Sequence, residues 1–411
     1  MSECAAEICF DAKLLGTQQH LYVIGDQCEW IDDVPTNVWH FSGELKLDSR
    51  RCFDTLLALN HVTINKLPPD RFVNAMATLT QETKIPWSYV MPHRDHRDFM
   101  KGLVNEAMVT LPLLSKAYYE TTWVHQGRLL SMLQPAKIDP RRYDEVRSLN
   151  PMNAKVIDSF APRQGDYALP VVYDRFASRT GRLTVASGPN ILTVKREYRD
   201  MLQSSFDDGE ILYIDFSALE PHVLLYEAGG RCPEHDMYSY ISNTMFKGSA
   251  TRDSVKVAVI SELYGSGRTA LENRLGIHGD ELDEFVHNVR FLFKTDALKQ
   301  RVKAEFYKNG FITNRHGRRI EIDTPLDHIF VNSYTQSTGV DVSLLGFAAI
   351  MDSLHDTDIR PLFVLHDALI LDVPREYISR AMAITDVKVP GYVQKFPVKC
   401  KPFIEQGMVA T

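Results

Sequence analysis

The chain has 411 residues, of which 44% are hydrophobic and 24% charged, and its formal net charge is −7. This composition is ordinary for a globular protein with a sizeable core, and it excludes a disordered or fibrous chain. The acidic balance argues against a protein that coats nucleic acid indiscriminately, but it leaves room for a local basic groove. The length predicts about two to four domains, or one large enzyme with several lobes.

The cysteines and the N-terminus predict the cellular compartment. Six cysteines are present without a C-x-x-C pair or a metal-ligand spacing, which indicates reduced thiols. The first residues, MSECAAEICFDAKLL, carry acids where a signal peptide needs basic residues. No apolar run approaches the roughly 18 residues of a membrane span. We therefore expect a cytoplasmic protein with no membrane partner.

In chain order, residues 1 to about 95 mix short alternating stretches with turns, which predicts a small α/β or mostly β unit without recognisable chemistry. The pattern turns helical over 99–133, with a break at Pro112. Strand-like runs follow at ILYIDF (211–216) and FVLHDALILDV (363–373), while 238–275 and 281–309 are helical in pattern. One β-rich region is therefore expected to be interrupted by a helical insertion.

Two acids stand at the edges of these apolar runs. Asp215 ends the first run, and Asp367 interrupts the second. An uncompensated buried carboxylate is costly, so it usually pairs or binds a metal, and a divalent cation between two acids would remove their repulsion. The letters HDAL also predict a hairpin with His366 and Asp367 in its turn, although an ordinary polar turn would carry the same letters.

The segment TRDSVKVAVISELYGSG (251–267) places four residues at a spacing of four: Arg252, Lys256, Ile260 and Tyr264. On an α-helix they form one stripe of two cations, an apolar side chain and an aromatic ring. Two cations one turn apart suit a triphosphate, and the other two positions suit a sugar and a base. An amphipathic surface helix remains the alternative for this stripe taken alone.

Together these stretches resemble the three motifs of family A DNA polymerases. IDFSALE is similar to the first motif, R-x-x-x-K-x-x-x-I-x-x-x-Y-G to the second and LHDA to the third, in the family's order. RTGRLTVASGPNILTV (179–194), NRHGRRIEI (314–322) and NSYTQSTGVDV (332–342) resemble three further family elements. The resemblance covers roughly residues 150–411.

The resemblance implies an α+β right-hand polymerase fold, with an antiparallel palm sheet and helical fingers and thumb. A small α/β or β-rich domain, either a degenerate relative of an exonuclease or an unrelated fold, precedes it. The expected divisions are 1–95 for the N-terminal domain, 96–200 for thumb helices and the start of the palm, 201–230 with 310–411 for the palm, and 231–309 for the fingers.

The same resemblance implies a template-dependent DNA polymerase that extends a primer 3′-hydroxyl with dNTPs. Asp215 and Asp367 would ligate two Mg²⁺ ions with the Phe216 carbonyl, and Mn²⁺ is an alternative ion. The residues implied to bind the nucleotide are Arg252, Lys256, Ile260, Tyr264, Glu220 and Tyr238. Those implied to contact primer–template DNA are Arg182, Asn190, Arg319, Asn332, Gln336 and His366. Glu220 would exclude a ribose 2′-hydroxyl by occupying its space, and replication accessory proteins are further expected partners.

Departures from the family pattern keep two alternatives open. Ile260 stands where the family usually has an aromatic residue, and Tyr238 replaces a phosphate-binding His. Single-subunit RNA polymerases share the three motifs and carry a non-aromatic residue at the position of Ile260, so an RNA polymerase is one alternative. Ala368 replaces a helper acid, so a catalytically silent palm that binds DNA is the other alternative.

The N-terminal third lacks the D-x-E signature of a 3′–5′ exonuclease, and we expect no proofreading. The acids in its first part, at Asp26, Glu29, Asp32 and Asp33, have the pattern of a solvated turn. The compact size without proofreading indicates a viral or other mobile replication system, in the cytoplasm of a bacterium or a virus-infected host cell.

Overall fold

The computed structural model describes residues 7–10, 19–24, 27–33, 39–41, 70–79, 90–95, 98, 118, 122, 124–175, 177–231, 236–248, 250–265 and 267–403. Most of the predicted helical stretch over 99–123 lies outside these ranges, and so does Asp26. The chain divides into two compact units, Met1–Glu120 and Thr121–Thr411. In the described ranges, no helix is long and apolar enough to cross a membrane.

The first unit contains a four-stranded sheet, in agreement with the β-rich prediction. Its strand order is β3-β2-β1-β4, and only the β1–β4 pair is parallel. Asp32 and Asp33 are exposed just after β3, and Asp32 accepts a hydrogen bond from Gln19 at 3.0 Å. The elements are β1 Glu7–Phe10, β2 His20–Ile24, β3 Gln27–Ile31, β4 Trp39–Phe41 and the helix α3 Asp70–Leu79.

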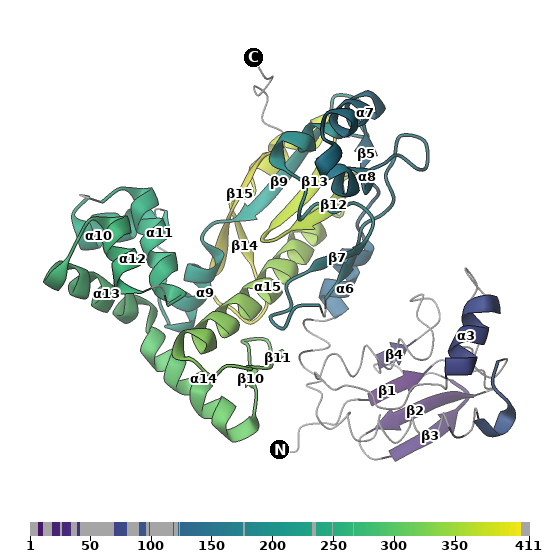
Figure 1. Cartoon of the computed structure of the whole chain (residues 1–411), viewed down its shortest axis with the longest axis horizontal. Helices are drawn as coiled ribbons and strands as arrows, with labels where there is room; N and C mark the ends of the chain where they lie inside the picture. Colours follow the sequence, from purple (N-terminus) through teal and green to yellow (C-terminus); the bar gives the residue numbers. More distant parts are fainter. Residues whose placement is uncertain are drawn as a thin grey trace. The chain divides into compact units, whose positions relative to one another are not determined.

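The second unit is built around a five-stranded antiparallel sheet of order β12-β13-β9-β15-β14 (Figure 1). β9 lies between two strands that come from the C-terminal part of the chain. The strands are β9 Glu210–Phe216, β12 Arg360–Leu365, β13 Ala368–Val373, β14 Asp386–Lys388 and β15 Lys395–Pro402. Both strand-like runs of the sequence are therefore strands, and they pair with each other as β9 and β13.

Alternation along β9 divides its side chains between two cores. Leu212, Ile214 and Phe216 point into the main core, whereas Ile211 belongs to a second core on the opposite face. Asp215 lies on the same face as Ile211 but near the other end of the strand. At that end the second core no longer covers the sheet, so the acid is not buried in either core.

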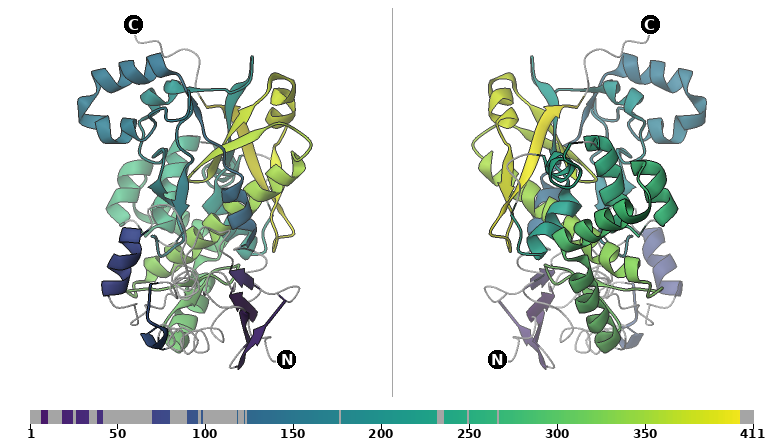
Figure 2. Two further views of the ribbon diagram at one scale, coloured as in Figure 1. Left: turned by 90° about the vertical axis from the view of Figure 1, so that its right-hand side faces the viewer. Right: turned by 90° about the vertical axis from the view of Figure 1, so that its left-hand side faces the viewer.

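The helix α15, Asp327–Ser353, covers the main-core face of the sheet (Figures 1 and 2). The rings of Phe216 and Phe347 lie 5.3 Å apart. Gly346 permits this close approach, because a Cβ there would be 2.6 Å from the Phe216 ring. This packing against α15 fixes the end of β9 at Phe216, the residue that follows Asp215.

A buried polar network joins α15 to its neighbours. Asp341 is fully buried and accepts hydrogen bonds from Arg318 (2.8 Å), Asn314 (2.6 Å) and Gln126 (2.6 Å). A buried carboxylate without such partners would be strongly destabilising. The donors come from α6 (Val124–Ser131) and from the turn between β10 (Ile312–Thr313) and β11 (Arg319–Ile320), so Asp341 joins α15 to two segments that are distant in the sequence.

After α9, five further described helices lie between β9 and α15, and α10 to α13 form a group away from the sheet strands β12–β15 (Figure 1). The five helices agree with the helical pattern predicted over 238–275 and 281–309, with breaks after Phe246, Leu263 and Phe293. Asp236 and Thr251 cap two of them by accepting backbone N–H bonds. The helices are α10 Met237–Phe246, α11 Arg252–Leu263, α12 Arg268–Leu275, α13 Gly279–Phe293 and α14 Thr295–Asn309.

Shorter elements complete the second unit. The helices are α6 Val124–Ser131, α7 Pro140–Leu149, α8 Ala154–Asp158, α9 Leu219–Glu227 and α16 Ile378–Met382. Three two-stranded sheets pair β5 Lys137–Ile138 with β8 Leu202–Gln203, β6 Val172–Asp174 with β7 Thr184–Ser187, and β10 Ile312–Thr313 with β11 Arg319–Ile320.

Candidate active site

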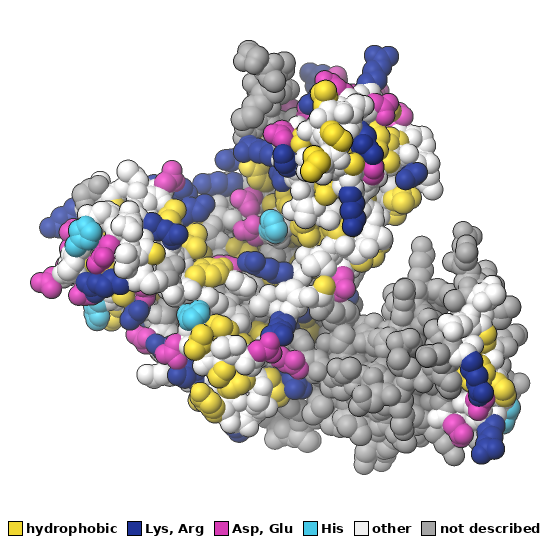
Figure 3. Space-filling model, in the orientation of Figure 1, with side chains coloured by type: hydrophobic (Ala, Val, Ile, Leu, Met, Phe, Trp, Pro, Cys, Tyr) yellow, Lys and Arg dark blue, Asp and Glu magenta, His cyan; other side chains and the backbone are white. Residues whose placement is uncertain are grey.

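A cavity of about 780 Å³ opens where β9, the β12–β13 turn, α11 and α15 meet. In Figure 3, Lys and Arg side chains surround a hollow in which acidic side chains are exposed. Most of the residues singled out in the sequence line this cavity, namely Arg182, Asp215, Phe216, Glu220, Tyr238, Arg252, Lys256, Ile260, Tyr264, Gln336, His366 and Asp367. Segments far apart in the sequence therefore converge on one site.

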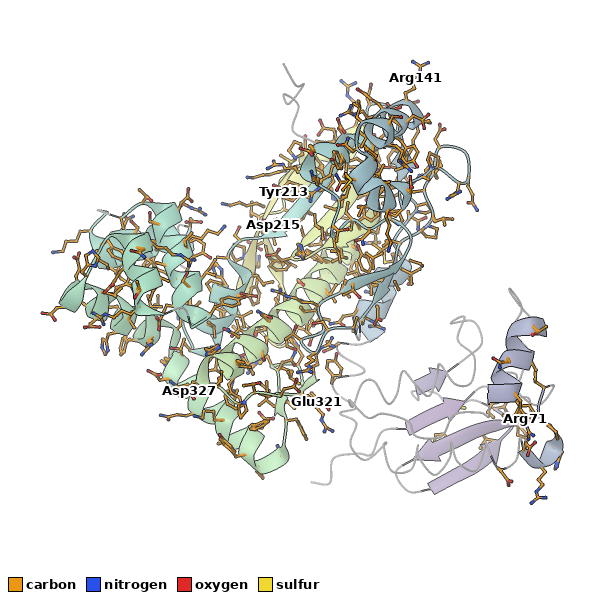
Figure 4. All side chains as sticks on the ribbon, viewed as in Figure 1. Arg71, Arg141, Tyr213, Asp215, Glu321 and Asp327 are labelled. Carbon is orange, nitrogen blue, oxygen red and sulfur yellow. The ribbon has the colours of Figure 1, made fainter. Side chains whose placement is uncertain are left out.

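The two acids meet because their strands are paired. Asp215 is in register with Ala368, the residue after Asp367, and the Phe216 N–H donates to the Asp367 carbonyl at 3.2 Å. Leu365 pairs with Ala368, so His366 and Asp367 form a two-residue turn, and the predicted hairpin is confirmed. Figure 4 shows Asp215 at the end of β9 nearest to α9.

The electrostatics of the acid pair favour a bound cation. Burial and the charge of Asp367 raise the pKa of Asp215 to about 6, although the positive charges of nearby lysines act in the opposite direction. Burial likewise raises the pKa of Asp367 above its ordinary value. Two carboxylates that resist joint ionisation are stabilised when a cation neutralises them. Such oxygens, together with the Phe216 carbonyl, are the donors that Mg²⁺ prefers.

The rest of a metal's coordination would have to come from outside the chain. Among the described residues, no group of three or more His, Cys, Asp or Glu side chains is arranged to hold a metal ion. A site with two carboxylates and one carbonyl leaves open positions, which water and substrate oxygens usually fill around Mg²⁺. The donor set thus fits an ion that also contacts a substrate.

The predicted stripe lies on one face of α11. Its residues Arg252, Lys256 and Ile260 line the cavity, and Tyr264 follows as the C-terminal cap. The adjoining face of the helix is buried through Val255 and Val259 among others. The helix is therefore amphipathic, but its polar stripe faces a cavity that also contains the acid pair.

Arg252 is already engaged by an acid that the sequence analysis did not single out. Its guanidinium donates to both oxygens of Asp236, at 2.9 and 2.7 Å, and lies 5.6 Å from the Tyr238 ring centre. The pairing lowers the pKa of Asp236 despite its partial burial. An incoming anion would thus meet a preoriented guanidinium, and also a competing carboxylate.

Glu220 forms the centre of a second group in the cavity. The Tyr264 hydroxyl donates to one of its oxygens, and Arg182 lies 3.6 Å from the other. Burial raises the pKa of Glu220 above its ordinary value. Asn332 does not line the cavity, but its side-chain amide donates to the Tyr264 carbonyl at 3.4 Å. These contacts fix the carboxylate beside the C-terminal end of the stripe.

Asn190 and Arg319 lie outside the cavity. The Asn190 backbone N–H donates to Ser159 at 2.9 Å, and its neighbour Ile191 belongs to the second core. The Arg319 guanidinium packs on the Phe311 ring at 4.0 Å. Neither residue belongs to the group around the acids, so any contact they make with DNA would lie away from this cavity.

The structure adds Asp236, Lys399 and Lys401 to the cavity lining. The sequence signal for the lysines was the alternation in FPVKCKP (396–402), which places both on the exposed face of a strand. Asp236 could have been recognised as an N-cap three residues before Ser239. The pairing of Asp236 with Arg252 had no local signal.

Comparison with known proteins identifies the family. The family model described as DNA polymerase family A matches residues 116–407. The chain belongs to DNA polymerase family A. The resemblance seen in the sequence motifs is thereby confirmed, and members of this family generally use divalent metal ions.

Two DNA polymerases to which the chain is similar come from different sources. The chain is 22% identical over 335 residues to "DNA polymerase I, thermostable" of Thermus aquaticus, covering 75% of this chain and 38% of that protein. It is 24% identical over 218 residues to the DNA polymerase of Mycobacterium phage L5, covering 50% of this chain and 35% of that protein. The chain therefore spans well under half the length of these relatives.

The polymerase fold is also recognised in three dimensions. The polymerase domain of Pol1 from M. smegmatis, solved in complex with DNA primer-template and dNTP, matches with a TM-score of 0.61 and 13% identity. The match covers 97% of this chain and 95% of that domain. The predicted α+β polymerase fold is confirmed.

Proposed function

We propose that this family A chain is a template-dependent DNA polymerase that extends a primer 3′-hydroxyl with dNTPs. The observation that carries the proposal is the convergence of Asp215 and Asp367 in one cavity with Arg252 and Lys256. Two acids suited to cations, next to two fixed cations suited to a triphosphate, are what phosphoryl transfer requires. The Mycobacterium smegmatis neighbour, solved with primer-template and dNTP, supports the same partners.

Two Mg²⁺ ions are the proposed cofactors, with Mn²⁺ as an alternative, held by Asp215, Asp367 and the Phe216 carbonyl. When bound, such ions activate the primer hydroxyl as a nucleophile and neutralise charge on the leaving pyrophosphate. The chain's own residues orient the reactants. The 3′-oxygen forms a bond to the α-phosphorus as the bond to the bridging oxygen breaks, and the hydroxyl proton passes to solvent.

Arg252 and Lys256 are proposed to bind the triphosphate, because they line the cavity one helical turn apart. Tyr238 would support Arg252 through the cation–π contact. Tyr264 and Ile260 would contact the base and sugar of the incoming nucleotide. Positioning and charge neutralisation then account for catalysis without a protein nucleophile.

Arg182, Gln336 and His366 are proposed to contact the primer–template end, since they line the same cavity as the acids. Minor-groove acceptors are shared by all base pairs, so such contacts need not select a sequence. For Asn190, Arg319 and Asn332, which lie outside the cavity, we propose contacts with DNA beyond the reacting end.

An RNA polymerase is the second candidate function, because Ile260 is not aromatic. Glu220 opposes it, since the carboxylate is partly buried in the cavity and would occupy space near a ribose 2′-hydroxyl. A silent DNA-binding palm is disfavoured for another reason. Such a module would have no use for two acids held together at the expense of raised pKa values.

Primer extension in the presence of Mg²⁺ tests the proposal. The wild type should extend a primed template with dNTPs in preference to NTPs, and Asp215→Ala or Asp367→Ala should reduce the rate by at least about a thousandfold. Asp253→Ala is the matched control, because that acid is 88% exposed and does not line the cavity. A mismatched primer end tests the proposed lack of proofreading, since an editing enzyme would remove the mismatch before extension.

A further inference from the structure

The strand β15 carries two lysines on the face of the five-stranded sheet that bears Asp215. Phe396, Val398 and Cys400 are buried in the main core, whereas Lys399 and Lys401 alternate with them and are exposed. Lys399 is in register with Asp215 across the β15–β9 pair. Directly opposed residues in an antiparallel pair share a face, so the Lys399 side chain emerges beside the acid.

Both ammonium groups are available to a ligand. Lys399 and Lys401 line the same cavity as Arg252 and Lys256 but come from the five-stranded sheet rather than from α11. With the residues that the structure describes, their side chains form no hydrogen bond or ion pair. Their charges lower the pKa of Asp215 only from a distance, against the effect of burial. Lysines that served only as counterions would be within about 4 Å of the carboxylate.

The adjoining wall of the cavity also favours anions. It is formed by Ser217, Ala218 and Leu219, at the start of α9. Ala218 is the N-cap and its methyl side chain cannot accept a hydrogen bond, so the N–H groups of Leu219 and Glu220 lack a side-chain cap. The Ser217 N–H donates to the Pro397 carbonyl at 2.9 Å, which attaches this turn to β15 two residues before Lys399.

We propose that Lys399 and Lys401 form a second phosphate-binding wall of the active site, which receives the β- and γ-phosphates of the incoming nucleotide and holds the pyrophosphate before it leaves. The inference rests on the proposed polymerase function. It adds a cationic surface on the five-stranded sheet to the one on α11. The reacting triphosphate would then be held between two pairs of cations.

A phosphate oxyanion at these lysines could come from the nucleotide or from the DNA backbone. The nucleotide is favoured because the two lysines share one cavity with the α11 cations and with the amides of the α9 turn. Backbone phosphates of a duplex would instead be expected along a row of cations that extends beyond the cavity. Separate measurements with the two ligands distinguish these sources.

The test compares Lys399→Gln/Lys401→Gln with a charge-keeping variant, Lys399→Arg/Lys401→Arg, and with Lys395→Gln. Lys395 is the matched control, because it is an exposed lysine of the same strand that pairs with Asp386 at 2.8 Å and lies outside the cavity. Binding of dNTP and of inorganic pyrophosphate is measured by calorimetry without turnover. Steady-state kinetics and the affinity for primer–template DNA are measured in parallel, and thermal melting checks the fold.

The Gln variant should weaken binding of dNTP and pyrophosphate by roughly tenfold or more, since two charge-assisted contacts are lost. Its KM for dNTP should rise accordingly, while its affinity for DNA changes less than about twofold. The Arg variant should restore most of the binding, and Lys395→Gln should resemble the wild type.

Two results would overturn the assignment. Unchanged binding of dNTP and pyrophosphate in a folded Gln variant would show that Lys399 and Lys401 do not bind these phosphates. A loss confined to DNA affinity, with a shallower salt dependence, would move the lysines to the DNA backbone. The calorimetric test also separates this inference from the proposed function. If the wild type binds pyrophosphate through these lysines but never extends a primer, the proposed function is refuted, while the phosphate-binding role of the lysines is supported.

Discussion

Arg252 and Asp236 form a bidentate ion pair inside the cavity, with N–O distances of 2.9 and 2.7 Å. The guanidinium is thereby oriented, but its charge is partly cancelled by the carboxylate. If Arg252 binds the triphosphate as proposed, the nucleotide competes with Asp236 for the same donors. Asp236 is therefore expected to set the affinity for the nucleotide rather than the rate of chemistry.

Asp236→Asn should lower the KM for dNTP several-fold, with kcat little changed, because one negative charge beside the triphosphate is removed. Asn remains a good N-cap, so α10 should be retained. Single-nucleotide incorporation kinetics measure both constants. Asp253→Asn is the control, since this acid also pairs with Arg252 but is 88% exposed and screened. A higher KM in Asp236→Asn would mean that orientation of Arg252 outweighs the competition.

Glu220→Ala should weaken discrimination against ribonucleotides by roughly tenfold or more, because the space beside the sugar is opened. The measured quantity is the ratio of kcat/KM for a dNTP to that for the matching NTP. Glu220→Gln keeps the volume and removes the charge, so it should retain most of the discrimination. If the Gln variant loses as much as the Ala variant, charge rather than bulk selects the sugar.

Asp215→Asn should stabilise the metal-free protein at pH 7.5, on the order of 1–2 kcal/mol after allowance for partial exposure. The pKa of Asp215 is raised from 3.8 to about 6 in the folded state. Its protonated form therefore favours folding, and this contribution is lost as the pH rises through 6. The difference between variant and wild type should disappear near pH 4.

Metal ions provide the internal check on that difference. Mg²⁺ that binds the acid pair should raise the melting temperature of the wild type and leave the Asn variant nearly unchanged. Thermal denaturation at several pH values, with and without Mg²⁺, measures both effects. Equal responses of the two proteins to Mg²⁺ would contradict metal binding at Asp215.

Arg318→Met should destabilise the fold by about 3 kcal/mol at neutral pH, because the buried Asp341 loses its cation. In the wild type, Arg318 and the neighbouring donors hold the pKa of Asp341 below its ordinary value. The ion-pair contribution is thus present at neutral pH and is lost as the pH falls through that lowered pKa. Denaturation curves of variant and wild type should differ at pH 7.5 and converge at acidic pH.

Arg380→Met is the matched control for Arg318→Met. The pair of Arg380 with Asp356 has the same N–O distance of 2.8 Å but is about half exposed. An exposed pair contributes at most about 1 kcal/mol. If both variants lost similar stability, burial would not be the source of the effect.

The sequence predicted the parts of the site that follow from local chemistry. Asp215 and Asp367 were recognisable because each breaks an apolar strand run, and the α11 stripe because its residues recur at helical spacing. The contribution of β15 was not predicted, since an exposed lysine gains meaning only when the register brings Lys399 opposite Asp215. The Asp236–Arg252 pair was likewise missed, because it joins two helices across a turn.

The strand order of the five-stranded sheet has a consequence for biosynthesis. β9 is hydrogen-bonded on one side to β13 and on the other to β15, which is made about 180 residues later. A nascent chain can therefore pair β9 with β13 first, but the other edge of the Asp215 segment stays open until Lys395–Pro402 has left the ribosome. Any nascent chain that stops before β15 lacks the strand that places Lys399 opposite Asp215.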